Sequence, residues 1–246
     1  MGEYSQTFQS PEAARDYEDV VYGKDSHDTW MWSLQRQRLL SVVEDLRREH
    51  GRLAYLDFAC GTGRVISILE GVTDNATGID ISASMIALAR TKVRRSSLMV
   101  GTIRDARLAD ERYELITAFR FFLNAEPQLR KATMAFLASH LRNSTSRLVF
   151  NVQGNKHSVR HLSIAARSLL GEAHNEMSLG DVAQLVDGAG LEIDSWYGFG
   201  IAPAFLYRTM LRPMAKSADG AATRWPSLGR FCYDLLFVCR LRHSSV

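Results

Sequence analysis

The spacing of the hydrophobic positions changes at residue 53. Before it, residues 28–49 carry apolar side chains at roughly helical intervals, and after it short apolar runs alternate with longer helical segments. The expected strands are 53–58, 76–81, 97–101, 113–119, 147–152, 191–199 and 233–241, and the expected helices between them lie near 63–70, 83–94, 126–142 and 178–189. This alternation predicts βα units around a parallel sheet.

Two segments lie outside this alternation. Residues 1–50 are expected to form a helical cap, with a first helix at 11–22 that begins after Ser10 with Pro11 as its first residue. Residues 200–232 separate the last two strands, and they are too long for a hairpin loop, so they are expected to form an insert or lid. We therefore predict a single domain over residues 1–246 that includes both segments.

Composition narrows the class of protein. The 246 residues are 46% apolar and 23% charged, which is ordinary for a globular chain, and a net charge of +3 does not indicate a nucleic-acid partner. The three cysteines form no C-x-x-C pair, which predicts neither disulfides nor a zinc site and favours a reducing, cytoplasmic compartment. No signal peptide, myristoylation pattern or membrane-spanning run is visible.

The sequence LAYLDFACGTGRV at residues 53–65 runs from an expected strand into a glycine loop. The Walker pattern is absent, and Ile66 occupies the third glycine position of a dinucleotide fingerprint. Asp57 at the end of the strand would repel a diphosphate. Asp80 ends the next strand, where a carboxylate can accept from both hydroxyls of a ribose. The expected ligand is a nucleoside without phosphates, and S-adenosylmethionine (SAM) meets that description.

Four successive motifs support this expectation: DFACGTGR from residue 57, GIDISASMIALAR from 78, GTIRDARL from 101 and ELITAF from 114. In order and spacing they resemble a class I SAM-dependent methyltransferase, of the type that acts on small molecules. The resemblance implies a Rossmann-like sheet of seven strands, mostly parallel with an antiparallel last strand. It also implies cofactor-binding residues at Asp57, Ala59, Gly61, Gly63, Asp80, Ile81, Met85, Ile103, Asp105 and Phe119.

The third motif departs from the family pattern. Many relatives have Gly-Asp where this chain has Gly101-Thr102, so the carboxylate that accepts from the adenine amino group is missing at that position. Asp105 could replace it, or Thr102 and the main chain of Ile103 could suffice. Cys60 is not expected to be catalytic, because nothing beside it would lower the pKa of its thiol.

The acceptor side is expected to follow the fourth and fifth strands. In FRFFLN at residues 119–124, the phenylalanines could face the sulfonium or belong to the core, and Arg120 could bind an acidic substrate group while pointing away from the methyl group. Asn151 is a candidate substrate contact at the tip of the fifth strand. His157 is the first candidate for a general base and His161 the second. No third ligand accompanies the two histidines, so no metal is expected.

Tyr17 and Tyr22 are candidates to fold over the cofactor, or to pack the amino-terminal helix. Residues 207–246 contain seven Arg and Lys residues against two Asp, a balance of +5, which fits a lid over a small-molecule pocket or a surface that contacts membranes or lipids.

The expected activity is methyl transfer from SAM to a small-molecule acceptor of sugar or secondary metabolism, by in-line displacement. Two alternatives stay open. An enzyme of the same fold could use another carbon of SAM, releasing methylthioadenosine, and a non-catalytic subunit could bind SAM without turnover.

Overall fold

The computed structural model describes residues 12, 27–103, 105, 108, 110–161, 175–223 and 225–242. The strands are β1 (Ala54–Phe58), β2 (Asn75–Asp80), β3 (Ser97–Val100), β4 (Leu115–Ala118), β5 (Arg147–Gln153), β6 (Leu191–Phe199) and β7 (Asp234–Leu241). The helices are α2 (His27–His50), α3 (Ile66–Leu69), α4 (Ala83–Lys92), α5 (Pro127–Ser139), α7 (Leu179–Asp187), η3 (Ala204–Arg208), α8 (Arg212–Ala222) and α9 (Pro226–Gly229). The helix expected at 11–22, with Tyr17 and Tyr22, lies outside the described residues.

The strands form one sheet in the order β3-β2-β1-β4-β5-β7-β6. Neighbours from β3 to β5 pair in parallel, whereas β7 runs antiparallel to both β5 and β6. The predicted Rossmann-like sheet is therefore confirmed. The chain order reverses between β1 and β4, and in open α/β sheets ligands bind where this reversal leaves a crevice at the carboxyl ends of the strands.

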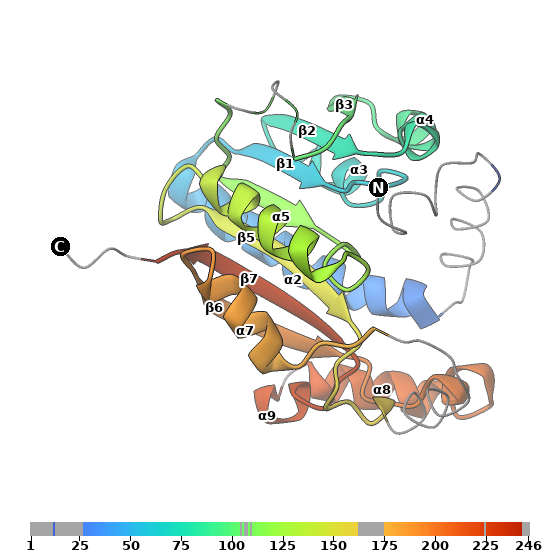
Figure 1. The fold of residues 1–246 in the computed structure, drawn as a ribbon. Coiled ribbons are helices and arrows are strands. Elements are labelled where there is room, and N and C mark those ends of the chain that lie inside the picture. Colours follow the sequence, from blue (N-terminus) through green and yellow to red (C-terminus); the bar gives the residue numbers. More distant parts are fainter. Residues whose placement is uncertain are drawn as a thin grey trace.

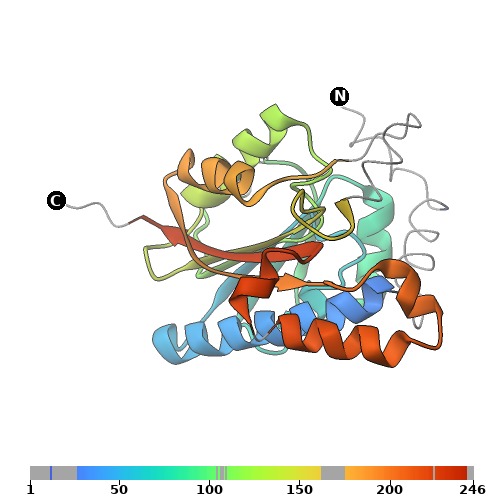
Figure 2. The same cartoon turned by 90° about the horizontal axis from the view of Figure 1, so that it is seen from below.

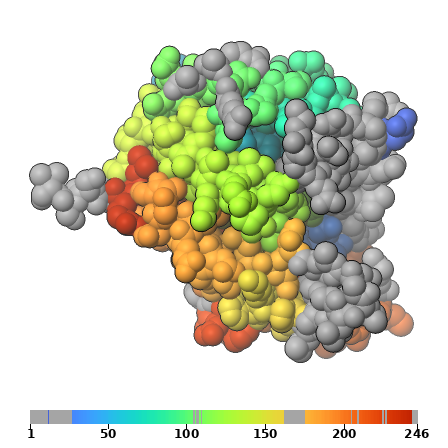
Figure 3. Space-filling view, viewed as in Figure 1, coloured from blue at the N-terminus to red at the C-terminus, as the bar shows by residue number. Residues whose placement is uncertain are grey.

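Helices cover both faces of this sheet (Figure 1). The helices α5 and α7 lie on one face, which the space-filling view shows in yellow-green and orange (Figure 3). Apolar side chains of α2 and α3, among them Leu39, Val43 and Ile66, pack on the other face against Tyr55 of β1 and Val149 of β5. None of the described helices is long and apolar enough to cross a membrane.

The segment between β6 and β7 folds into three short helices, η3, α8 and α9. In the view from below, α8 runs alongside α2 (Figure 2), and a buried carboxylate joins the two. Asp219 of α8 accepts from the indole Nε1 of Trp30, the hydroxyl of Tyr207 and the main-chain N–H groups of Ile201 and Ala202. The insert is thus fixed to α2 and to the end of β6.

Candidate cofactor and acceptor site

The glycine loop follows β1 and uses its two glycines differently. Both have positive φ, 54° at Gly61 and 77° at Gly63, where a side chain is strained. A Cβ on Gly61 would meet no atom within 4 Å, so its open side can admit a ligand. A Cβ on Gly63 would lie 3.0 Å from Cβ of Ala89. Gly61 therefore leaves space for a ligand, whereas Gly63 lets α4 pack closely against the loop.

Asp80, at the end of β2, is held by main-chain donors. Its Oδ2 accepts from the N–H of Gly61 at 2.8 Å, and its Oδ1 accepts from the N–H of Ser82 at 2.9 Å. Burial raises the pKa of Asp80 above its usual value, although these hydrogen bonds lower it. Each carboxylate oxygen has more than one lone pair, so the side chain can still accept hydrogen bonds from a ligand.

Asp57, at the corresponding place in β1, is almost fully buried. Its Oδ1 accepts from the hydroxyl of Thr117 at 2.7 Å, and its Oδ2 accepts from the N–H of Ile66 at 3.1 Å. Burial raises the pKa of Asp57 to about 7, while these two bonds and the charge of Arg64 lower it. The carboxylate thus joins the loop and the start of α3 to β4.

A cavity of about 200 Å³ opens beside the loop. Its lining includes Ala59, Gly61, Asp80, Ile81, Met85, Ile103 and Phe119, all expected from the sequence to bind the cofactor. A smaller cavity of about 50 Å³ shares part of this lining and also reaches Asp57 and Arg64. Gly63 and Asp105 line neither cavity. Asp105 packs instead against Gly101, where an added Cβ would lie 2.5 Å from its Oδ2.

The three phenylalanines after β4 have separate positions. Phe119 lines both cavities and makes an edge contact with Trp32 of α2, with ring centroids 5.6 Å apart. Phe121 lines the larger cavity. Phe122 is fully buried against Phe150 of β5, with centroids 4.8 Å apart. Two of the three thus face the cavity, and the third belongs to the core.

Arg120 adjoins both cavities in a conformation that is uncommon for a non-glycine residue, with φ of 58°. Its N–H donates to Oδ1 of Asn151 at 2.7 Å, and its guanidinium lies 3.0 Å from Oδ1 of Asp28 in α2. Asn151 lines neither cavity. It acts on the site indirectly, because its side-chain amide holds the main chain of Arg120. Such backbone strain is typical of functional sites.

Asn151 also contacts a second buried carboxylate, that of Asp234. Its Nδ2 lies 3.4 Å from Oδ1 of Asp234, the first residue of β7, and Oδ2 of Asp234 accepts from the amides of Gln35 at 2.5 Å and Gln153 at 3.3 Å. Burial raises the pKa of Asp234 to about 7, against the charge of Arg120 and the two glutamine bonds. This polar cluster joins α2, β5 and β7 next to Arg120.

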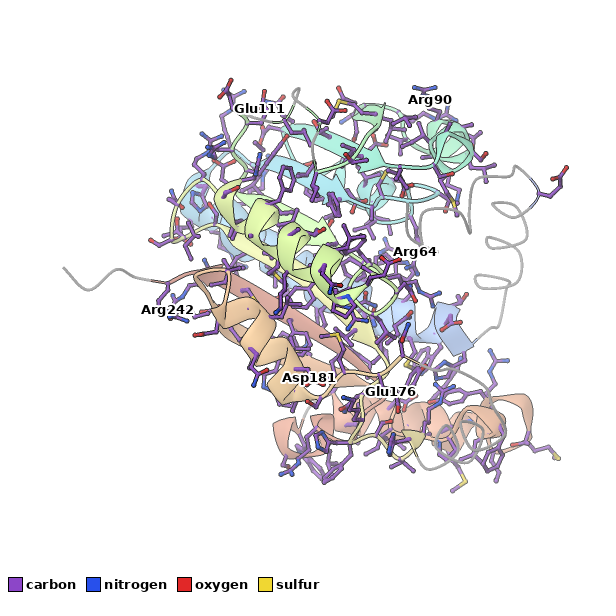
Figure 4. The ribbon with its side chains drawn as sticks, viewed as in Figure 1. Arg64, Arg90, Glu111, Glu176, Asp181 and Arg242 are labelled. Atoms are coloured by element: carbon purple, nitrogen blue, oxygen red, sulfur yellow. The ribbon has the colours of Figure 1, made fainter. Side chains whose placement is uncertain are left out.

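The two candidate histidines differ in their surroundings. His157 is exposed, and its N–H donates to Oδ1 of Asn155. Nδ1 of His161 lies 2.6 Å from Oε2 of Glu176, whose side chain is only 7% exposed. Neither histidine lines the cavities described above. Figure 4 labels Glu176 and Arg64, both on the side of the molecule where the parallel strands end, with Glu111 and Arg242 at the opposite end.

Several contributors to this site were not singled out from the sequence. They are Asp28, Gln35, Thr117, Glu176 and Asp234. One signal did exist, because Asp234 is a lone carboxylate in the apolar run YDLLFVCRL, and a buried charge there requires partners. Among the described residues, no group of three or more His, Cys, Asp or Glu side chains could hold a metal ion.

Comparison with known proteins agrees with this geometry. Residues 56–144 match the model of a family described as a methyltransferase domain. The solved magnesium protoporphyrin IX methyltransferase of Synechocystis PCC 6803, with bound S-adenosylhomocysteine (SAH), aligns over 94% of this chain and 99% of that chain, with a TM-score of 0.61 and 16% identity. A SAM-dependent methyltransferase from Clostridium acetobutylicum ATCC 824 aligns over 94% and 98%, with a TM-score of 0.59 and 14% identity.

A third solved structure, the [4+2]-cyclase SpnF, aligns over 84% of this chain and 81% of its own, with a TM-score of 0.56 and 15% identity. Comparison with curated proteins finds no significant match. At these identities the structural similarities establish the fold, which is that of the SAM-dependent methyltransferases.

Proposed function

We propose that this methyltransferase, whose cofactor is S-adenosylmethionine, methylates a small-molecule acceptor at oxygen or nitrogen. The observation that carries the proposal is the hydrogen-bonded arrangement of Gly61 and Asp80 in the lining of the larger cavity. The three cysteines, all free, fit a reducing cytoplasmic compartment. Sugar or secondary metabolism is the proposed source of the acceptor.

The cavity residues fit the parts of the cofactor. Gly61 leaves open the space that a side chain would fill, next to the main chain where the methionine end would lie. Asp80 is oriented by two main-chain donors and can accept from the ribose hydroxyls. Ile81, Met85 and Ile103 give the cavity apolar walls suited to adenine. Ile81 is 42% exposed, as an apolar residue at the mouth of a ligand site would be.

The protein's contribution to the reaction is mainly alignment of the acceptor and exclusion of water. The bound cofactor supplies both the methyl group and its leaving group. Phe119 and Phe121 cover the cavity with aromatic surface, and cation–π attraction to a sulfonium contributes ~0.5–2 kcal/mol. The ion pair with Asp28 directs the charge of Arg120 toward α2, which keeps it from opposing the sulfonium.

His161 is the better candidate for a general base if the acceptor is an alcohol. The carboxylate of Glu176 can hold Nδ1–H, which would leave Nε2 free to accept a proton. His157 has no such orienting partner in the described part of the chain. Because His161 lies outside the cavity lining, an acceptor that uses it must extend from Phe119 past the end of β5.

The test uses SAM with a labelled methyl group, incubated with the purified protein and fractions of small metabolites. Label transferred to a small molecule, with release of SAH in equal amount, is the expected result. Binding of SAH in calorimetry without transfer of label to any fraction would favour a SAM-binding subunit instead. Mass spectrometry of ligands that copurify with the protein would identify the acceptor class directly.

A second candidate function is a different reaction on the same fold. It is favoured by the similarity to a solved [4+2]-cyclase, which shows that the architecture accommodates other chemistry. An enzyme that uses another carbon of SAM would release methylthioadenosine instead of SAH. Chromatography of the nucleoside products therefore separates the two functions.

A further inference from the structure

The outer face of α8 is unusual for a helix exposed to water. Its exposed positions are Pro213, Met214, Ser217, Ala218 and Ala221, and none of them is charged. A helix on the surface of a globular protein normally presents charged and polar side chains on this face. The face of α8 is therefore suited to contact with something other than bulk water.

Large apolar side chains of the insert are exposed as well. The most exposed are Met210 at 98%, Met214 at 69% and Phe205 at 65%, followed by Trp225, Leu211 and Phe231. Among the described residues, only Ile81, Val100 and Val159 are comparable large apolar side chains that lie outside the insert and are exposed. Scattered exposed apolar residues are normal, but a cluster confined to one segment marks an interaction site.

The described side chains of the insert carry mainly positive charge. The basic ones are Arg212, Lys216 and Arg230, and the one acid among them is Asp219. Asp219 is fully buried and accepts hydrogen bonds from four donors. It contributes no carboxylate to the surface, where Arg212 and Lys216 are half-buried at the edge of the apolar face.

We propose that this insert surface, formed by the exposed apolar side chains named above together with Arg212 and Arg230, docks the enzyme on an anionic lipid bilayer. Met210, Leu211 and Met214 would enter the boundary between headgroups and acyl chains, as the apolar side of an interfacial helix does. Arg212 and Arg230 would meet the lipid phosphates, because basic residues beside such a face are attracted to a negative surface potential.

The charge of the insert favours an anionic bilayer, rather than a second copy of the chain, as the partner of this surface. Two insert surfaces facing one another would bring basic side chains together, since Asp219, the acid among the described residues of the insert, is buried, whereas lipid phosphates neutralise them. The anchoring of α8 also favours a docking surface over a loose lid. Asp219 holds it through Trp30 and Tyr207, and Lys216 lies over the Trp30 ring at 4.5 Å. The surface is presented by a fixed element.

The experiment measures sedimentation of the full chain with sucrose-loaded vesicles of phosphatidylcholine, with and without phosphatidylserine. The wild type is expected to bind the anionic vesicles in a salt-sensitive manner and the neutral ones much less. The pair Arg212→Gln and Arg230→Gln should weaken binding about tenfold or more, at ~1 kcal/mol per cation near the surface. The pair Met210→Ser and Met214→Ser should weaken it by about the same factor.

Matched controls remove equivalent groups elsewhere. The pair Arg36→Gln and Arg90→Gln takes away two exposed cations from α2 and α4, and Val100→Ser removes an exposed apolar side chain from β3. Both controls should bind the anionic vesicles like the wild type. All variants should keep wild-type affinity for SAH, which shows that they are folded.

Three outcomes would overturn the proposal. The first is no binding of the wild type to anionic vesicles. The second is equal loss in the insert variants and their controls, which would mean that net charge alone drives adsorption. The third is a dimer in sedimentation velocity that the methionine variants abolish while vesicle binding is absent or unchanged, which would assign the face to a second copy.

Discussion

The main-chain N–H of Gly61 donates a 2.8 Å hydrogen bond to Oδ2 of Asp80, so the glycine loop after β1 orients the carboxylate at the end of β2. The two motifs are therefore one structural unit, with a second donor from Ser82 on the other oxygen. A ligand that contacts the loop and the carboxylate together contacts groups whose relative position is already fixed.

Replacing Asp80 with alanine should weaken SAH binding by about 100-fold, because hydrogen bonds to a charged group contribute ~1.5–3 kcal/mol each and the loop also loses its acceptor. Isothermal titration calorimetry measures the change. Asp45→Ala, which removes an exposed carboxylate from α2, is the control and should bind SAH normally. Unchanged affinity in Asp80→Ala would exclude this carboxylate from the cofactor site.

The two loop glycines should respond differently to alanine. Both substitutions place a side chain at positive φ, which costs ~1–2 kcal/mol. Gly63→Ala adds overpacking against Ala89, at a further ~1–3 kcal/mol, so its larger effect should be on the free energy of unfolding. Gly61→Ala fills the open side of the loop, so its larger effect should be on SAH affinity.

Urea denaturation and calorimetry on the same two proteins separate these effects. A Gly61→Ala variant that binds SAH like the wild type would show that the ligand does not approach the loop from this side. A Gly63→Ala variant no less stable than Gly61→Ala would show that α4 can move away from the loop at little cost.

Two buried carboxyl groups should make stability fall as the pH rises. Burial raises the pKa values of Asp57 and Asp234 from 3.8 to about 7 in the folded state. Between these values the folded protein binds more protons than the unfolded chain. The free energy of unfolding should therefore decrease as the pH rises from about 4 to about 7, by ~1.4 kcal/mol per pH unit for each group.

Asparagine cannot titrate, so a substitution at either position removes the contribution of that carboxyl group to the pH dependence. Asp57→Asn and Asp234→Asn should each flatten the dependence of the unfolding free energy on pH between about pH 5 and pH 7. The exposed Asp45→Asn should leave the slope unchanged. Equal slopes in wild type, Asp57→Asn and Asp234→Asn would mean that both carboxyl groups are ionised throughout this range.

The sequence contained most of the information about the sheet. All seven strands lie where the apolar runs predicted them, and the helix expected at 178–189 begins with a reciprocal capping box between Ser178 and Asp181. These features are local, since a run of apolar residues or a cap three residues long is readable without knowing what packs against it. The helix expected at 63–70 is shorter, Ile66–Leu69, because the loop through Gly63 delays its start.

The hydrogen-bonded pairs within the site could not be predicted from local sequence patterns. Gln35 and Asp234 are 199 residues apart in the chain, and only the packing of α2 and β7 brings them together. The bond between His161 and Glu176 depends in the same manner on where the segment before α7 returns to the end of β5. The sequence pattern indicated which types of residue the site contains, but only the tertiary structure shows which of them form hydrogen-bonded pairs.

Two asparagines form hydrogen bonds with the main chain of Arg120. Asn151 is buried and accepts from its N–H, whereas Asn124 is exposed and donates to its carbonyl, each at 2.7 Å. Asn151→Ala leaves the N–H without that acceptor and Asp234 without one donor, which should cost ~2–3 kcal/mol of unfolding free energy. Asn124→Ala should cost less than ~0.5 kcal/mol, because water can replace the exposed amide.

The Asn151→Ala variant also tests whether the strained conformation of Arg120 matters for the ligand, whereas Asn124 lines the larger cavity itself and serves as a control for stability only. Without the buried amide, Arg120 can relax from its φ of 58°, and Phe119 beside it would shift in the wall of both cavities. SAH affinity should then fall about tenfold in Asn151→Ala, at ~1.4 kcal/mol. An Asn151→Ala protein that loses stability yet binds SAH with wild-type affinity would assign the asparagine to the fold alone, because the cavity wall would have kept its shape without it.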